Sequence, residues 1–233
     1  MAHPSGYGTP SSDLLPGVRG SRVAFAGLLF AVLFLLAWWL LRESPSFDAD
    51  DDQLLAYYGN PEQRRDSMIA GLYVIPFAGI AFIWFMAALR DRYVRSATRE
   101  HTILSTAHFV SGALVVVSLF MIATVELAVV WLAEADDTLD IDGARSLLAL
   151  GSASSDIMAL RSAAVFVGVS ASRGVRSGLF PRVHGAASVV TALALLVAYE
   201  AAPWVSLVFP LWVAASAVLI LVRRRSIEVA EGA

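Results

Sequence analysis

The chain of 233 residues contains no cysteine and no lysine. Without cysteine there can be no disulfide bond, no thiolate metal site and no thiol nucleophile. Without lysine there can be no Schiff-base site and no lysine general base. All seventeen Lys or Arg positions are therefore arginine. Chemistry at a site in this protein must come from carboxylates, histidines, hydroxyls or arginines.

Charged residues are also scarce, at 16% of the chain, whereas 58% of the residues are hydrophobic. An average soluble domain is about 45–50% apolar. The excess lies in long apolar runs, which predict that lipid surrounds most of the chain and that the bilayer is its main partner. A nucleic-acid partner is not expected, because short loops between apolar runs present no basic face of a soluble fold.

The arginines are sorted along the chain. Twelve of them fall in four segments that alternate with acidic segments: Arg19 and Arg22; Arg90, Arg92, Arg95 and Arg99; Arg173, Arg176 and Arg182; Arg223, Arg224 and Arg225. Cytoplasmic loops of membrane proteins carry the excess of arginine, so this alternation predicts a multi-pass protein of the inner (plasma) membrane with both termini in the cytoplasm.

The predicted fold is therefore all-α, a bundle of six transmembrane helices. The expected spans cover residues 23–41, 67–89, 103–132, 144–170, 184–203 and 204–222. No ten-residue alternation of apolar and polar residues competes with this reading. Residues 1–18, rich in Gly, Pro and Ser, are expected to form a disordered cytoplasmic tail, and residues 226–233 a second cytoplasmic tail.

The acidic segment between the first two predicted spans holds a further helix signal. Acids at Asp48 to Asp52 precede the aromatic pair Tyr57 and Tyr58, and Gly59-Asn60-Pro61 follows. Acids at the start and a Gly-Asn-Pro stop predict a short extracytoplasmic helix here. In the next span, Pro76 is expected to produce a kink.

Ionisable groups inside a span are costly and usually face the interior of a bundle. Six polar residues of predicted spans three and four are candidates for a ligand site: His108, Glu126, Ser152, Ser155, Asp156 and Arg161. Asp156 and Arg161 are five residues apart, about 140° around a helix, so they cannot form the usual side-chain pair within it. Each therefore needs another partner.

Two interpretations of these residues stay open. They could line a polar cavity between spans three and four that binds a small solute or passes protons. In the other interpretation, Asp156 and Arg161 are each satisfied across helices by serines, backbone carbonyls or one another through a water, and they only fix the packing of the bundle. The second interpretation is favoured by Gly151, Ser155, Ala159 and Ala163, since small residues at every fourth position are typical of close helix packing.

Other kinds of site find little support in the sequence. The Asp48 to Asp52 cluster lacks the central glycine and distal glutamate of an EF-hand loop. His101 and His108 are too far apart on one helix to hold a single ion, so no metal site is predicted. Sequence motifs of serine, aspartate and zinc intramembrane proteases are absent, and neither a catalytic residue nor a cofactor is predicted.

Several short stretches carry a resemblance. They are Pro45-Ser-Phe-Asp48 with Gln53-Leu-Leu-Ala-Tyr57-Tyr58 and the Arg64-Arg65 pair, Phe82-Ile-Trp84-Phe-Met-Ala-Ala-Leu-Arg90, and Arg176-Ser-Gly178-Leu-Phe-Pro181-Arg182. In these the chain resembles a family of uncharacterised integral membrane proteins found widely in actinobacteria. The resemblance implies a topology and no catalytic residue. His184 departs from the pattern, where such proteins have an apolar or aromatic residue.

Two functions from different classes follow as hypotheses. The first is an interaction role, as an accessory subunit that docks a membrane-protein partner. The second is a small-solute transporter or ligand-binding membrane protein that uses the cavity between spans three and four.

Overall fold

The computed structural model describes residues 16–96, 102–135, 139–197 and 203–231. Every regular element in these ranges is a helix, which confirms the predicted all-α class. The elements are α1 (Pro16–Leu40), α2 (Asp51–Gly59), α3 (Pro61–Ile69), the π-helical turn η1 (Ala70–Val74), α4 (Ile75–Ser96), α5 (Thr102–Ala135), α6 (Ile141–Ala153), the π-helical turn η2 (Ser154–Leu160), α7 (Arg161–Arg176), α8 (Arg182–Val197), the 3₁₀ turn η3 (Pro203–Leu207) and α9 (Val208–Glu231).

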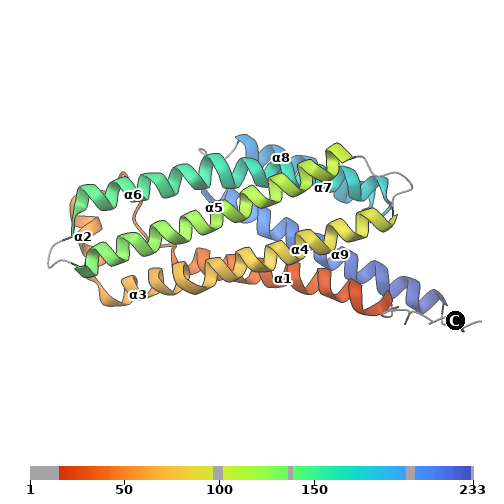
Figure 1. The fold of residues 1–233 in the computed structure, drawn as a ribbon, viewed down its shortest axis with the longest axis horizontal. Helices are drawn as coiled ribbons and strands as arrows, with labels where there is room; N and C mark the ends of the chain where they lie inside the picture. Colours follow the sequence, from red (N-terminus) through yellow and green to blue (C-terminus); the bar gives the residue numbers. More distant parts are fainter. Residues whose placement is uncertain (1–15, 97–101, 136–138, 198–202, 232–233) are drawn as a thin grey trace, which may run out of the picture.

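The elements join into long rods, because the π-helical turns continue the helices on either side of them (Figure 1). One rod consists of α3, η1 and α4, and another of α6, η2 and α7. Together with α1, α5, α8 and α9 they make six rods in the described part of the chain. The short helix α2 lies at one end of the bundle, opposite the end that carries the C-terminus.

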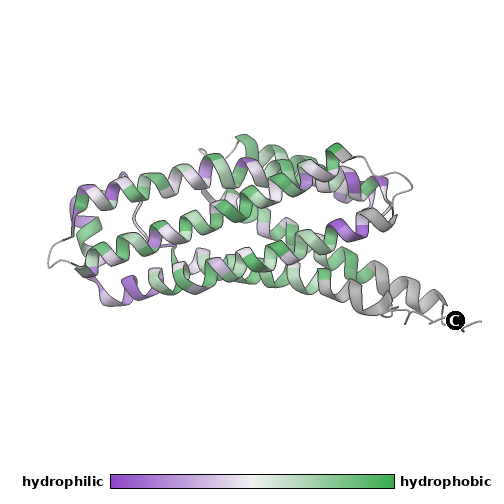
Figure 2. Cartoon of the chain, viewed as in Figure 1, coloured by the Kyte–Doolittle hydropathy of each residue, from purple (hydrophilic) through white to green (hydrophobic). Residues whose placement is uncertain are grey.

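Four of the described helical segments are long and apolar enough to cross a membrane: Val23–Leu40, Pro61–Tyr93, Ile103–Ala135 and Trp204–Val222. Large apolar side chains such as Phe25, Trp84 and Phe109 are exposed on the outside of the bundle. Figure 2 shows hydrophobic residues along the middle of the rods and hydrophilic ones gathered toward their ends. An apolar surface of this extent indicates a protein embedded in a membrane.

The helix boundaries differ from the sequence expectations at both termini. Helix α1 begins at Pro16, inside the segment expected as a disordered tail, and proline is well suited to the first turn of a helix. Helix α9 continues to Glu231, through most of the segment expected as the second tail. Residues 1–15 and 232–233 of those two predicted tails lie outside the described residues.

The irregularity expected at Pro76 takes the form of the π-helical turn η1, which ends two residues before it. Proline has no N–H to donate and its ring crowds the carbonyl four residues earlier. In η1 the Ile75 N–H donates to the carbonyl of Ala70, five residues back. A π-helical turn of this kind changes the ladder locally without ending the helix.

The turn between α7 and α8 depends on one glycine. Gly178 has a φ of 71°, a left-handed conformation that favours glycine. The chain then folds back so that the Phe180 N–H donates to the carbonyl of Gly174 over 2.9 Å. The Phe180 ring lies directly on Gly174, where a Cβ would come within 2.1 Å of it. This turn closes the arginine-rich end of α7.

Neighbouring rods pack as a ring. Helix α1 packs along α4 and α9, α5 packs on α4 and α7, and α8 packs on α7 and α9. Gly27 permits the close approach of α1, since a Cβ there would lie 2.8 Å from the Phe85 ring and 2.9 Å from Ala217.

Four phenylalanines meet in the centre of this ring, one each from α1, α4, α7 and α9. They are Phe30, Phe82, Phe166 and Phe209, here called the aromatic cluster. Phe82 lies at the middle, with ring centroids 4.9 Å from Phe30, 5.0 Å from Phe166 and 5.5 Å from Phe209. All four side chains are buried. Aromatic rings at these separations stabilise one another beyond their burial.

The Phe82→Ala variant is expected to lose about 3–5 kcal/mol of unfolding free energy, because truncation of a buried phenylalanine leaves a cavity. Unfolding of the detergent-solubilised chain, followed by circular dichroism, measures this. The control is Phe77→Ala on the same helix, since Phe77 is 56% exposed and should cost little. Equal destabilisation by the two variants would contradict a central role for the cluster.

Candidate functional site

A cavity of about 500 Å³ lies inside the ring of rods, on the side of the aromatic cluster that faces α2. Its walls come from α1, α4, α5, η2, α7, η3 and α9. We call it the chamber. Most of its lining is apolar, and it consists of Phe34, Ala37, Trp38, Leu41, Arg42, Ser44, Ile75, Ala78, Val115, Leu119, Ile122, Ser155, Ala159, Leu160, Ala163, Ser206 and Phe209.

A second cavity of about 300 Å³, here called the vestibule, adjoins the chamber. It is lined by Leu41, Ser44, Pro45, Ile122, Val125, Glu126, Leu148, Gly151, Ser152 and Ser155. Leu41, Ser44, Ile122 and Ser155 line both cavities, so the two spaces adjoin along a shared wall. Together they place a polar compartment beside an apolar one.

The chamber exists because one of its walls is made of small side chains. Ser155, Ala159 and Ala163 line it, from η2 and α7. The sequence favoured these positions, with Gly151, as a close packing face. At Gly151 the stripe is tightly packed, since a Cβ there would lie 3.0 Å from Val125 Cγ1. The small-residue stripe therefore leaves space rather than closing a seam over most of its length.

The aromatic cluster borders the chamber through Phe209, and this side of the chamber is here called its floor. Phe209 lines the chamber and also belongs to the cluster, where its ring centroid is 5.7 Å from that of Phe30. On the other side of the cluster, Phe166 packs on the His108 ring with centroids 4.6 Å apart. The chamber is thus separated by packed rings from the arginine-rich half of the bundle.

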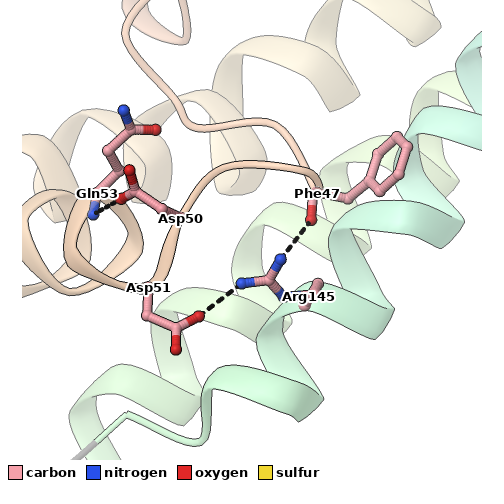
Figure 3. Close-up of polar contacts among 5 residues, drawn as sticks. All are labelled: Phe47, Asp50, Asp51, Gln53 and Arg145. Carbon is pink, nitrogen blue, oxygen red and sulfur yellow. Dashed lines mark hydrogen bonds and ion pairs between the residues drawn. The ribbon is translucent and has the colours of Figure 1, made fainter.

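Helix α2 is held over the acidic end by side-chain contacts (Figure 3). Asp50 caps it, its Oδ1 accepting from the Gln53 N–H over 2.8 Å. Arg145 on α6 donates to Asp51 Oδ1 over 2.7 Å and to the Phe47 carbonyl over 3.5 Å. The aspartates around Asp50 thus begin a helix, as the sequence predicted, and one of them ties it to α6.

The underside of α2 carries two tyrosines that reach into the bundle. The Tyr57 hydroxyl lies 3.0 Å from Ser67 Oγ, and the Tyr58 side chain is buried against α5 and α6. Burial raises the pKa of both phenols, and for Tyr58 the nearby Glu126 carboxylate raises the pKa further. Helix α2 therefore covers the part of α5 that carries Glu126.

Three of the six candidate residues come together in this site. Glu126, Ser152 and Ser155 line the vestibule, on α5, α6 and η2. His108, Asp156 and Arg161 line neither the chamber nor the vestibule. The expected cavity between spans three and four is also bounded by other rods, because the chamber reaches α1, α4 and α9.

Asp156 and Arg161 lie at the π-helical turn. Asp156 is in η2, and Arg161 begins α7. The Arg161 guanidinium is exposed and donates through Nη1 to the backbone carbonyl of Asp156. A π-helical turn replaces regular hydrogen bonds in this region, and such turns are frequent at functional sites.

His108 belongs to a different cluster, in the arginine-rich half of the bundle. Its Nδ1 lies 3.0 Å from Ser170 Oγ, and the Tyr93 hydroxyl donates to the Ser170 carbonyl over 2.8 Å. The Arg173 guanidinium lies 4.6 Å above the Tyr93 ring. The sequence assigned Arg173 only to topology. The spacing of Phe166, Ser170 and Arg173, at i, i+4 and i+7, is the signal that places them on one buried face.

His184 packs between α8 and α9. Its Nε2 lies 3.0 Å from Ser216 Oγ, and its ring stacks on that of Trp212 with centroids 5.9 Å apart. The Trp212 N–H donates to Ser188 Oγ over 2.8 Å. These contacts fix two helices against each other, which gives His184 a packing role.

Among the described residues, no group of three or more His, Asp or Glu side chains is placed to hold a metal ion. Two further ionisable residues, His101 and Glu200, lie outside those residues.

Comparison with known proteins gives no relative. No protein-family model matches the chain, and no curated protein and no solved structure matches it either. The resemblance to actinobacterial membrane proteins therefore stays a prediction. The geometry of the two cavities carries the functional argument.

Proposed function

We propose that this chain is a six-span protein of the plasma membrane that binds a small amphipathic ligand in the chamber and vestibule. The observation that carries the proposal is the apolar chamber that adjoins a polar vestibule inside one bundle. Ligand pockets in proteins are typically lined by apolar side chains with a few polar groups that fix the orientation of the ligand.

The proposed topology rests on the six rods. Four contain segments that meet the length and composition of a membrane span; the other two are the rod of α6, η2 and α7, which carries Asp156 and Arg161, and the shorter α8. The charge asymmetry between the ends supports a cytoplasmic location for the arginine-rich end.

Binding is favoured over transport by the floor of the chamber. The aromatic cluster lies between the chamber and the arginine-rich half, and its rings are buried and in contact. A solute could cross only if at least one of these rings moved away. The arrangement seen here holds a ligand from one side.

The topology is tested with single cysteines, since the chain has none of its own. Gly59→Cys, in open space at the end of α2, is expected to react with a membrane-impermeant maleimide in intact cells. Ser177→Cys, after α7, should react only after permeabilisation. Reaction of both cysteines in intact cells would contradict the proposal.

The binding site is tested by filling it. Ala159→Phe places a ring in the chamber and is expected to reduce photolabelling of chamber residues by a diazirine-bearing dodecanol about tenfold, because the space is taken. Labelled residues are identified by mass spectrometry of the chain in nanodiscs.

The matched control is Ala153→Phe, on an exposed position of the same rod, which should label as the parent chain does. Labelling that is spread over lipid-facing residues and is equal in all three proteins would show that the chamber does not bind the probe.

A partner-binding role is the second candidate, and Arg161 favours it. Its guanidinium is exposed on a rod that we propose to cross the membrane, between the exposed apolar residues Ile157 and Val165 on the same face. An arginine at that position is costly in lipid and is relieved by a carboxylate on a neighbouring helix.

Co-purification in mild detergent tests this role. A partner retained by the parent chain should be lost from Arg161→Gln and kept by Arg145→Gln, which alters an arginine at the end of the bundle. A partner that is retained equally by both variants would argue against Arg161 as the contact.

A further inference from the structure

We infer that the ligand is a cationic amphiphile: an amine or quaternary ammonium head sits in the vestibule at Glu126, and an apolar tail fills the chamber. The inference rests on the proposed function and adds to it the sign of charge of the head group. Four observations support it: the burial of one carboxylate, the lack of an ion pair for it among the described residues, the shape of the cavity and the charge at the acidic end of the bundle.

Glu126 is a buried carboxylate in the wall of a cavity. The residue is 8% exposed and lines the vestibule from α5. Its Oε2 atom has no hydrogen-bond partner among the described residues. Ser67 on α3 is a neutral polar neighbour of the carboxylate. A buried ionised carboxylate is costly unless it is paired, so a cation brought by a ligand would stabilise it.

No arginine in the described part of the chain forms an ion pair with Glu126. Arg42 is the arginine in the lining of the chamber. Its guanidinium is already engaged: it lies 2.9 Å from Glu43 Oε1, donates to the Trp39 carbonyl and stacks 4.5 Å above the Trp39 ring. The Glu126 carboxylate in the cavity wall therefore has no cationic side chain paired with it among the described residues.

The shape of the site selects an amphiphile rather than a bare ion. Besides Glu126, the vestibule offers the hydroxyls of Ser44, Ser152 and Ser155. The adjoining chamber is larger, and Phe34, Leu119 and Phe209 contribute apolar walls. An inorganic cation would occupy only the vestibule, whereas an alkyl ammonium would bury its chain in the chamber at the same time.

Charge at the acidic end also favours a cation. Asp50, Asp51 and Asp52 begin α2, Asp140 and Asp142 begin α6, and Glu62 and Asp66 lie on α3. The arginines at this end, Arg42, Arg64, Arg65 and Arg145, are fewer than the acids, so its net charge is negative. A surface of net negative charge raises the local concentration of cationic ligands. An anionic amphiphile would be repelled both at this surface and by Glu126.

Three photoactivatable probes with the same diazirine-bearing twelve-carbon chain test the inference: a primary amine, an alcohol and a carboxylic acid. The full chain in nanodiscs of zwitterionic lipid is labelled at pH 7 and the modified residues are mapped. Chamber labelling by the amine is expected to exceed that by the acid at least about tenfold, because of the charge interaction in a partly dry site.

Glu126→Gln keeps the size and hydrogen-bonding capacity of the side chain but removes the charge, and should bring the amine and the acid to within about twofold of each other. Glu126→Asp, which retains the charge, should keep the preference in part. The matched control is Glu134→Gln, an exposed glutamate on the same helix, which should leave it unchanged. Circular dichroism of each variant shows that it is folded.

The outcomes separate the two proposals. Equal chamber labelling by all three probes in the parent chain, or a preference for the amine that survives in Glu126→Gln, would overturn the assignment of a cationic head while the chamber remains a binding site. Chamber labelling by none of the probes would overturn the proposed function itself.

Discussion

The aromatic cluster is the interaction on which the rest of the structure depends. Phe30, Phe82, Phe166 and Phe209 come from four different rods and meet around Phe82. In a membrane the outer surface of each helix is as apolar as its inner surface, so burial alone does not decide which faces meet. Close packing of rings supplies the missing preference. The cluster also fills the centre of the bundle at one position along the helices. The space between the cluster and the end that carries α2 can therefore remain open.

The open space follows from the side chains that surround it. Beyond the cluster, η2 and α7 present Ser155, Ala159 and Ala163, and none of these is large enough to reach α1 or α4 across the bundle. A stripe of small residues brings two helices together only where a second helix packs against it, as Val125 on α5 packs against Gly151. Elsewhere it leaves a void, and an apolar void adjoining a polar one suits a ligand with two chemically different ends.

The helical class and the short helix that begins after Asp50 could be predicted from the sequence, because they depend on apolar runs, capping residues and a Gly-Asn-Pro stop. The cavity could be predicted only in part. Glu126, Ser152 and Ser155 were found because polar residues inside apolar runs are conspicuous. The contribution of Phe34 and Ala37 on α1 was missed, since apolar residues in an apolar helix carry no sign of which ones line a space. The two π-helical turns were also missed, because backbone hydrogen bonding of that kind leaves no periodic signal.

The surroundings of buried ionisable groups differ between the two halves of the bundle, and this difference points to the half that holds the proposed ligand site. In the arginine-rich half the His108 ring is fully buried, and Tyr93, Phe166 and Ser170 enclose it, so that a ligand could reach it only if those side chains moved. In the acidic half Glu126 is almost as deeply buried, yet it lies in the wall of a cavity that adjoins an apolar chamber. A polar group that packed side chains enclose is out of reach of a ligand, whereas a polar group in the wall of a cavity can contact one. Of these two groups the carboxylate, and not the histidine, is therefore the one that a ligand can contact without displacing protein side chains.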